Sequence, residues 1–272
     1  MAFLAVFAAA FALAHASAGP PKQNGTFALL GGTPKVVSKF WATHGNGLTS
    51  QLNVAQYPMG SSTPILNYAL EMQRTMHMVV IRDDFATFDH LHPAFNTTTG
   101  AFLENFTKEP NHRYYLYADS RPHDLPQQVF RFTLESDGPV AKAAPSLTAS
   151  LPTATTGPYT VVLEHTTIAA NTPYSAEIEI NENGHPAHDL GSYLGAASHV
   201  VFINTATLQY VHVHPMAANA PGGGGSHMNM TGTGPRQHLE LPALPAGTYK
   251  MWMQFRGAKY EIYTVAFTLA VQ

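Results

Sequence analysis

Cysteine is absent from the 272-residue chain. Its absence excludes disulfides, zinc sites with thiolate ligands, and blue-copper centres in which a cysteine binds the metal. Charge is also scarce, because only 11% of residues are Asp, Glu, Lys or Arg, less than half of the usual share of about 25%. The formal net charge is -3 and the sequence has no basic cluster. Nucleic-acid binding therefore lacks its electrostatic basis, and we expect no nucleic-acid partner.

The N-terminus is almost free of polar residues. Residues 1–14 are nearly all Ala, Phe, Leu and Val, and Ala16-Ser17-Ala18 follows as a small-x-small cleavage pattern, although no Lys or Arg precedes the run. A helix that spans a bilayer needs about 20 apolar residues, so this run is short for an anchor. The pattern predicts a signal peptide over residues 1–18, a secreted or periplasmic protein, and no other contact with a membrane.

Two stretches of the sequence repeat each other. Residues 77–93 align without a gap with residues 199–215, and residues 113–134 align without a gap with residues 248–269. The first pair matches three histidines and a proline in each copy: His77, His90, His92 and Pro93 against His199, His212, His214 and Pro215. The second copy has an insertion between its blocks, which we place at the glycine run 222–225. A duplication of this kind indicates two similar domains.

The segment between the copies has the composition of a linker. Residues 138–157 are rich in Ala, Pro, Ser and Thr and have no apolar period. We therefore predict a first domain over residues 19–137, a linker over residues 138–157, and a second domain over residues 158–272.

Within each copy the apolar pattern predicts short strands and no helices. In the first copy we expect strands at 35–41, 48–55, 66–73, 77–82, 87–92, 113–119 and 127–135. In the second copy we expect strands at 159–165, 174–181, 199–204, 209–214, 236–241, 247–256 and 259–270. Roughly seven strands per copy indicate an all-β protein with two tandem Greek-key β-sandwiches, cupredoxin-like or immunoglobulin-like. Tyr249 is placed for a tyrosine corner at the start of a late strand.

The repeated histidines have the spacing of a β-hairpin. A loop over residues 83–86 would put His77 opposite His92 and Val79 opposite His90. Alternate residues share a face, and opposed side chains have Cβ atoms ~5 Å apart. Three imidazoles could then share one ion at bond lengths of ~2.0 Å.

The same register applies to His199, His212 and His214 in the second copy. The sequence therefore predicts one ion per domain. Imidazole must be neutral to bind, so the ion should be bound more tightly at about pH 7 than at about pH 5.

Methionines near the histidines favour copper over the alternative, zinc, because thioether binds soft Cu(I) and imidazole suits Cu(II). The strand residues Met78 and Met251 are better explained as core filling. The glycine-rich insertion contains His227, Met228 and Met230, which we predict as auxiliary metal ligands. His238, before a late strand, is a candidate fourth ligand, and His112 has a comparable place in the first copy.

The two histidine segments and the stretch LPAGTYKMWMQFR resemble secreted bacterial proteins with tandem cupredoxin-like or immunoglobulin-like domains, of the heavy-metal-binding, copper-associated type. The resemblance covers roughly residues 66–134 and 159–270. It implies a sandwich fold and a metal-handling role, and it implies no catalysis.

Three functions remain open from the sequence. The first is extracytoplasmic binding of a transition metal, for buffering, resistance or delivery, with another extracytoplasmic copper protein as a candidate partner. The second is a mononuclear metal-dependent oxidoreductase, cupin-like or dismutase-like, since three histidines leave a coordination position open. The third is a structural or adhesive tandem sandwich in which the histidines only pack.

Overall fold

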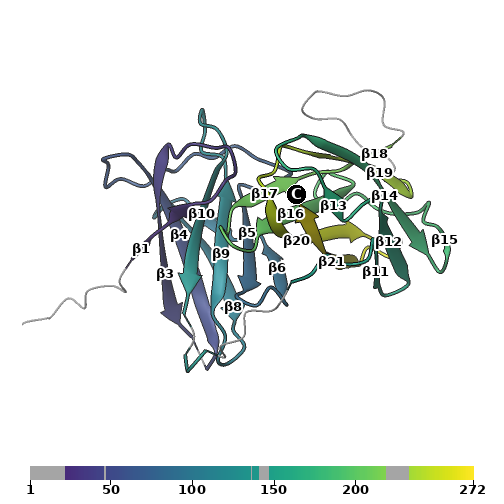
Figure 1. Ribbon diagram of the computed structural model, residues 1–272. Helices are drawn as coiled ribbons and strands as arrows, with labels where there is room; N and C mark the ends of the chain where they lie inside the picture. The colour runs from purple at the N-terminus through teal and green to yellow at the C-terminus, as the bar shows by residue number, and fades with distance from the viewer. Residues whose placement is uncertain (1–21, 46, 136, 141–146, 219–232) are drawn as a thin grey trace, which may run out of the picture.

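The computed structural model describes residues 22–45, 47–135, 137–140, 147–218 and 233–272. These residues are folded as strands, turns and loops without a helix, and they form two β-sandwiches that lie against each other (Figure 1). Accordingly, no helix among them could cross a membrane. The predicted signal peptide, residues 1–18, lies outside the described residues.

The first sandwich has two five-stranded sheets. One sheet has the order β1 (Gln23–Asn24), β3 (Val36–His44), β4 (Thr49–Pro58), β8 (Ala101–Thr107) and β7 (Ala94–Asn96). The other has the order β2 (Thr26–Phe27), β10 (Gln128–Leu134), β9 (Tyr114–Ser120), β5 (Met76–Arg82) and β6 (Phe88–Leu91). Side chains such as Leu52, Phe102 and Leu116 fill the space between the sheets and are fully buried. Alternation of buried and half-buried residues along β3 fits a strand with one face on this core.

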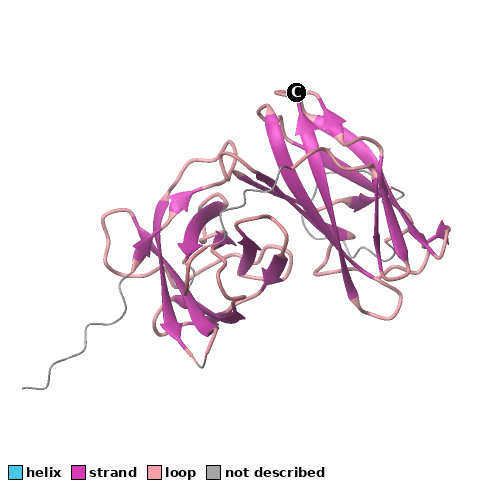
Figure 2. Ribbon diagram, turned by 60° about the horizontal axis from the view of Figure 1, so that its bottom comes forward, coloured by secondary structure: helices cyan, strands magenta, loops and turns pink. Residues whose placement is uncertain are grey.

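The second sandwich repeats this arrangement. Its first sheet has the order β11 (Thr153–Thr156), β12 (Tyr159–Leu163), β14 (Tyr174–Glu182), β19 (Arg236–Leu241) and β18 (Met216–Ala217), and β15 (His185–Pro186) also pairs with β14. Its second sheet has the order β13 (Thr167–Ile168), β21 (Ile262–Val271), β20 (Gly247–Arg256), β16 (Ser198–Asn204) and β17 (Tyr210–Val213). Figure 2 shows both sandwiches as strands joined by loops.

The strand order confirms the predicted all-β tandem sandwich. The two domains have the same strand order. In the first sheet, β3-β4-β8-β7 of the first domain corresponds to β12-β14-β19-β18 of the second. In the second sheet, β10-β9-β5-β6 corresponds to β21-β20-β16-β17. This Greek-key order is that of an immunoglobulin-type sandwich. The Tyr249 hydroxyl donates a 3.0 Å hydrogen bond to the Pro245 carbonyl, which is the expected tyrosine corner.

The strand predicted at residues 66–73 is wrong. Met72 and Gln73 have φ angles of 43° and 65°, and Glu71 and Arg74 exchange backbone hydrogen bonds of 2.8 and 2.9 Å across this turn. Two consecutive left-handed residues cannot continue a strand. The strand Ala101–Thr107 was not predicted. Thr153–Thr156, which we placed in the linker, pairs with β12 and belongs to the second sandwich.

The two sandwiches share a third apolar cluster. Strands β5 and β16 are buried along almost their whole length, on both faces. One face of each strand points into its own core, and the other packs against the opposite domain. The cluster between the domains contains Val79, Ile81, Phe85, Tyr117 and Val129 from the first domain and Val201, Ile203, Tyr210 and Trp252 from the second. The apolar rows of the two hairpins therefore form the domain interface.

The chain near the N-terminus adds backbone contacts to this interface. The Tyr210 amide donates to the Ala28 carbonyl at 2.8 Å, and the Leu30 amide donates to the Tyr210 carbonyl at 3.0 Å. The Ala28 amide donates to the Val129 carbonyl at 2.9 Å. This short segment is thus bonded to both domains and helps to fix their relative position.

Candidate metal centre

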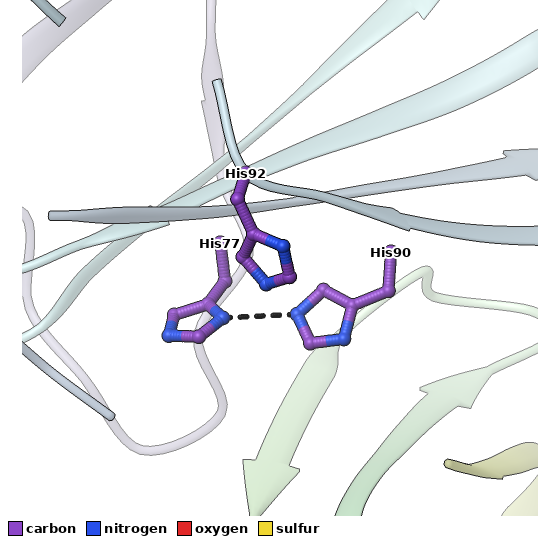
Figure 3. A group of neighbouring side chains, drawn as sticks. All are labelled: His77, His90 and His92. Carbon is purple, nitrogen blue, oxygen red and sulfur yellow. Dashed lines mark hydrogen bonds between the residues drawn. The ribbon is translucent and has the colours of Figure 1, made fainter. Parts of the chain in front are cut away.

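The first histidine hairpin has the predicted register. In the antiparallel pair of β5 and β6, Val79 lies opposite His90 and Ile81 lies opposite Phe88. His77 is near the start of β5, and His92 follows the end of β6. The three imidazoles point toward one another (Figure 3), with ring centroids 4.7 to 5.2 Å apart.

The second hairpin has the same register, but its predicted trio of His199, His212 and His214 is not among the groups of described residues whose ligand nitrogens lie within 4.8 Å of one another. Val201 lies opposite His212 in the pair of β16 and β17. The ring of His214 lies 4.6 Å from that of His199 and 4.4 Å from that of His212.

The two sets of rings form one cluster, whereas the sequence indicated a separate trio in each half of the molecule. The His77 ring centroid lies 5.6 Å from that of His199 and 5.3 Å from that of His212. His90 lies 5.5 Å from both of these rings. The hairpins that carry the histidines are also the strands of the domain interface, so docking of the domains brings the trios together.

Two combinations of these histidines have ligand nitrogens within 4.8 Å of one another. The first is the predicted trio of His77, His90 and His92. The second joins His90 to His199 and His212, and therefore crosses the domain boundary. One of the two groups that could hold a metal thus spans the contact between the two domains.

Hydrogen bonds to acceptor groups fix the tautomers of His77 and His90. His77 Nε2 lies 3.0 Å from the Glu71 carbonyl oxygen, and His90 Nδ1 lies 3.0 Å from Gln254 Oε1. A carbonyl oxygen can only accept, so the ring protons are on these two nitrogens. His77 Nδ1 and His90 Nε2 are then unprotonated in neutral rings, and they face each other at 2.9 Å.

The second pair has the same pattern. His199 Nε2 donates to the Tyr193 carbonyl at 3.1 Å, and His212 Nδ1 donates to Asp119 Oδ2 at 3.1 Å. His199 Nδ1 and His212 Nε2 face each other at 3.2 Å. Two nitrogens bound to one tetrahedral ion at ~2.0 Å would lie about 3.3 Å apart. The second pair, at 3.2 Å, has this spacing, and the first pair, at 2.9 Å, is shorter. A shared cation would replace the repulsion between the two lone pairs of each pair.

The groups that orient the two pairs are related by the duplication. The Glu71 and Tyr193 carbonyls each precede their histidine by six residues. Asp119 and Gln254 occupy matching positions of the aligned blocks, on β9 and β20, and each bonds a histidine of the other domain. Such acceptors commonly orient metal-binding histidines. Neither Asp119 nor Gln254 was predicted from the sequence, although a polar residue on these apolar strands is a usable signal.

The third histidine of each set has a nitrogen with no partner. Nε2 of His92 and Nε2 of His214 are buried and make no hydrogen bond. Burying a polar nitrogen without a partner costs about 1–3 kcal/mol. A metal ion would satisfy both atoms, so the donor set fits a metal.

Burial keeps the rings in their ligand form. Loss of solvent, followed by the effect of neighbouring imidazoles, lowers the pKa of His90, His199 and His212 well below its usual range. Burial likewise lowers the pKa of His92 and of His214 to about 4. These rings are thus neutral near pH 7, as a metal ligand must be.

The proposed auxiliary ligands are not part of the cluster. His238 is on β19, where its Nε2 lies 3.0 Å from Ser175 Oγ, and His112 Nε2 lies 4.0 Å from Glu109. Neither occurs in the groups of described residues that could hold a metal. His227, Met228 and Met230 lie outside the described residues.

The strand methionines belong to the sandwich cores. Met78 packs in the first core and Met251 in the second, both without solvent exposure. Met76 and Met253 are buried in the same two cores. These four methionines are thus core residues, as predicted for Met78 and Met251.

Comparison with known proteins gives limited information. Residues 153–272 match the family described as "Domain of unknown function (DUF8832)". No curated protein matches the chain.

Among solved structures, red sea bream transglutaminase is 12% identical with a TM-score of 0.24 over 88% of this chain, which spans 32% of that protein. The chicken interferon gamma receptor alpha chain is 12% identical with a TM-score of 0.24, over 85% of this chain and 96% of that one. The native alpha-2-macroglobulin of E. coli is 11% identical with a TM-score of 0.25, over 93% of this chain and 15% of that one. Similarities of this size support no conclusion about function.

Proposed function

We propose that the protein is an extracytoplasmic transition-metal-binding protein that uses the six clustered histidines for metal buffering, resistance or delivery. The main support is the protonation pattern. Four imidazole nitrogens without protons face each other in two pairs, and two further buried nitrogens have no partner. A bound metal would give each of these six nitrogens a partner.

Copper is the favoured ion, with zinc as the alternative. Imidazole binds both metals, but among the divalent first-row ions copper has the highest affinity for nitrogen ligands. The chain has no cysteine, so copper would not meet a competing thiolate. We therefore propose copper as the cofactor or cargo, and another extracytoplasmic copper protein as the partner that supplies or receives it.

An oxidoreductase remains a second candidate because of the ligand count. Three imidazoles per ion leave a position for a small reactant. Assays of the copper-loaded protein with dioxygen and with superoxide would distinguish the two candidates: turnover favours the enzyme, and stable binding without turnover favours buffering or delivery.

Equilibrium dialysis against Cu(II), Cu(I) and Zn(II) tests metal binding directly. We expect the wild type to retain metal and the His90→Ala/His92→Ala/His212→Ala/His214→Ala variant to lose it. A His112→Ala/His238→Ala variant is the matched control and should bind like the wild type. If the quadruple variant does not fold, the pair His92→Ala/His214→Ala removes only the two nitrogens without partners. Equal metal content in wild type and a folded cluster variant would contradict the proposal.

A further inference from the structure

We infer that the cluster holds two ions in one centre between the domains, and that Asp119 makes the two ion positions unequal. This inference rests on the proposed metal-binding function and goes beyond the site predicted for each domain. The first position would use His77, His90 and His92, whose ligand nitrogens lie within 4.8 Å of one another. The second would be centred on His199 and His212, which form such a group together with His90. His214, whose ring lies 4.6 and 4.4 Å from those of His199 and His212, would complete the second position.

The number of free donors indicates two ions. Each copy supplies three imidazoles, and in each copy two nitrogens face each other while a third, buried nitrogen has no partner. A single tetrahedral ion has only four positions, so it would leave two of the six imidazoles without a ligand role. Two ions with three imidazoles each would use the full set.

The distances between rings indicate that the ions would share one space. Within the first copy, the ring of His77 lies 5.1 Å from that of His90. The same ring lies 5.3 Å from that of His212 in the other domain. Because distances across the interface match those within a copy, two bound ions would be near neighbours rather than independent sites.

The two halves of the centre differ in the residue that orients a histidine, which is Asp119 in one half and Gln254 in the other. Asp119 accepts from His212, while Gln254, at the matching position, accepts from His90. Asp119 is buried and held by hydrogen bonds from Gln127 Nε2 at 2.7 Å and from the Tyr210 hydroxyl at 3.3 Å. A carboxylate that accepts from a ligating histidine makes the imidazole a stronger donor than a neutral amide does. The position with His212 should therefore fill first.

Titration of the full chain with Cu(II), in competition with a chelator of known affinity, tests this inference. We expect two ions per chain bound in two resolved steps. We also expect an electron paramagnetic resonance signal of the doubly loaded protein that is weaker than that of two isolated Cu(II) ions. Asp119→Asn should lower the affinity of the first step by about 10–100-fold and bring the two steps together.

Gln254→Glu is the mirror variant, which supplies a second carboxylate. It should strengthen the weaker step, and it keeps the test available if Asp119→Asn does not fold. One ion per chain, lost in the histidine variants, would overturn the two-ion inference while the proposed function stands. Two ions of equal affinity in the wild type, or steps unchanged in both variants, would overturn the role of Asp119. Absence of bound metal in the wild type would overturn the proposed function itself.

Discussion

Phe88 of the first domain stacks on Trp252 of the second, with ring centroids 5.1 Å apart and an interplanar angle of 16°. Tyr117 and Tyr210 form the corresponding stack at 5.2 Å and 22°. Phe88 aligns with Tyr210 and Tyr117 with Trp252 in the duplicated blocks, so each stack joins matching positions of opposite domains. The interface therefore has a pseudo-twofold arrangement, like that of an isologous dimer. The histidine cluster is part of the same contact.

Replacing Trp252 by Ala should weaken metal binding, although Trp252 does not belong to the histidine cluster. The side chain is buried in the domain interface. Truncating a buried tryptophan costs ~3–5 kcal/mol, and partial separation of the domains would lower the apparent metal affinity by roughly tenfold. Urea unfolding and copper competition measure the two effects.

Phe267→Leu is the control for this variant, because Phe267 is buried in the core of the second sandwich, away from the interface cluster. It should reduce the free energy of unfolding but leave the copper affinity of the folded protein unchanged. Equal loss of affinity in both variants would show that docking of the domains is irrelevant to the site.

Copper affinity should change little between about pH 7 and about pH 5, because burial lowers the pKa of five of the six clustered histidines. Burial holds the pKa of His92 and of His214 at about 4. The sequence alone predicts tighter binding at about pH 7 than at about pH 5, and the lowered pKa values make the expected difference small. Competition titrations at several pH values provide the measurement. A steep loss of affinity centred near about pH 6.5 would indicate exposed, unperturbed imidazoles.

The metal-free protein should lose stability as the pH falls from 6.5 toward about 4. The five histidines with a lowered pKa bind protons more readily when unfolded, so the free energy of unfolding declines in this window. Burial raises the pKa of Asp119 and acts in the opposite direction, but it is a single group. Urea unfolding across this range should show the decline. The His92→Ala/His214→Ala variant should show a smaller one, and an equal decline in that variant would contradict the assignment.

Tyr249→Phe should destabilise the second domain without changing metal binding. The hydroxyl donates to the Pro245 carbonyl, and its loss would leave this acceptor without its partner. The expected cost is about 1–3 kcal/mol. Thermal unfolding and copper dialysis, run on the same preparation, would test both parts. Reduced metal content in the folded variant would connect the tyrosine corner to the site, contrary to this account.

Much of the fold could be predicted from the duplication and from the two-residue period of the strands. The hairpin register followed from the loop length, and it correctly placed Val79 opposite His90. The turn at Met72 and Gln73 could not be predicted, because neither residue is of a type that favours a positive φ. The strand Thr153–Thr156 was missed because its composition is that of a linker, and its stability comes from pairing with β12.

The site was only partly predictable because half of its geometry comes from the contact between domains. The face of β5 that carries Val79 and Ile81 is the surface on which the second domain docks. Sequence spacing reports contacts within one hairpin, but it carries no information on how two hairpins meet. The roles of Asp119 and Gln254 depend on the contact between the domains, since each accepts a hydrogen bond from a histidine of the opposite domain.

X-ray absorption spectroscopy of the copper-loaded full chain tests the central claim most directly, since it reports the atoms bound to the metal. We predict about three imidazole nitrogens per copper at ~2.0 Å, and the loss of this signal in the histidine variants. A ligand shell dominated by sulfur, or by oxygen without imidazole, would contradict the assignment of the clustered histidines as the metal centre.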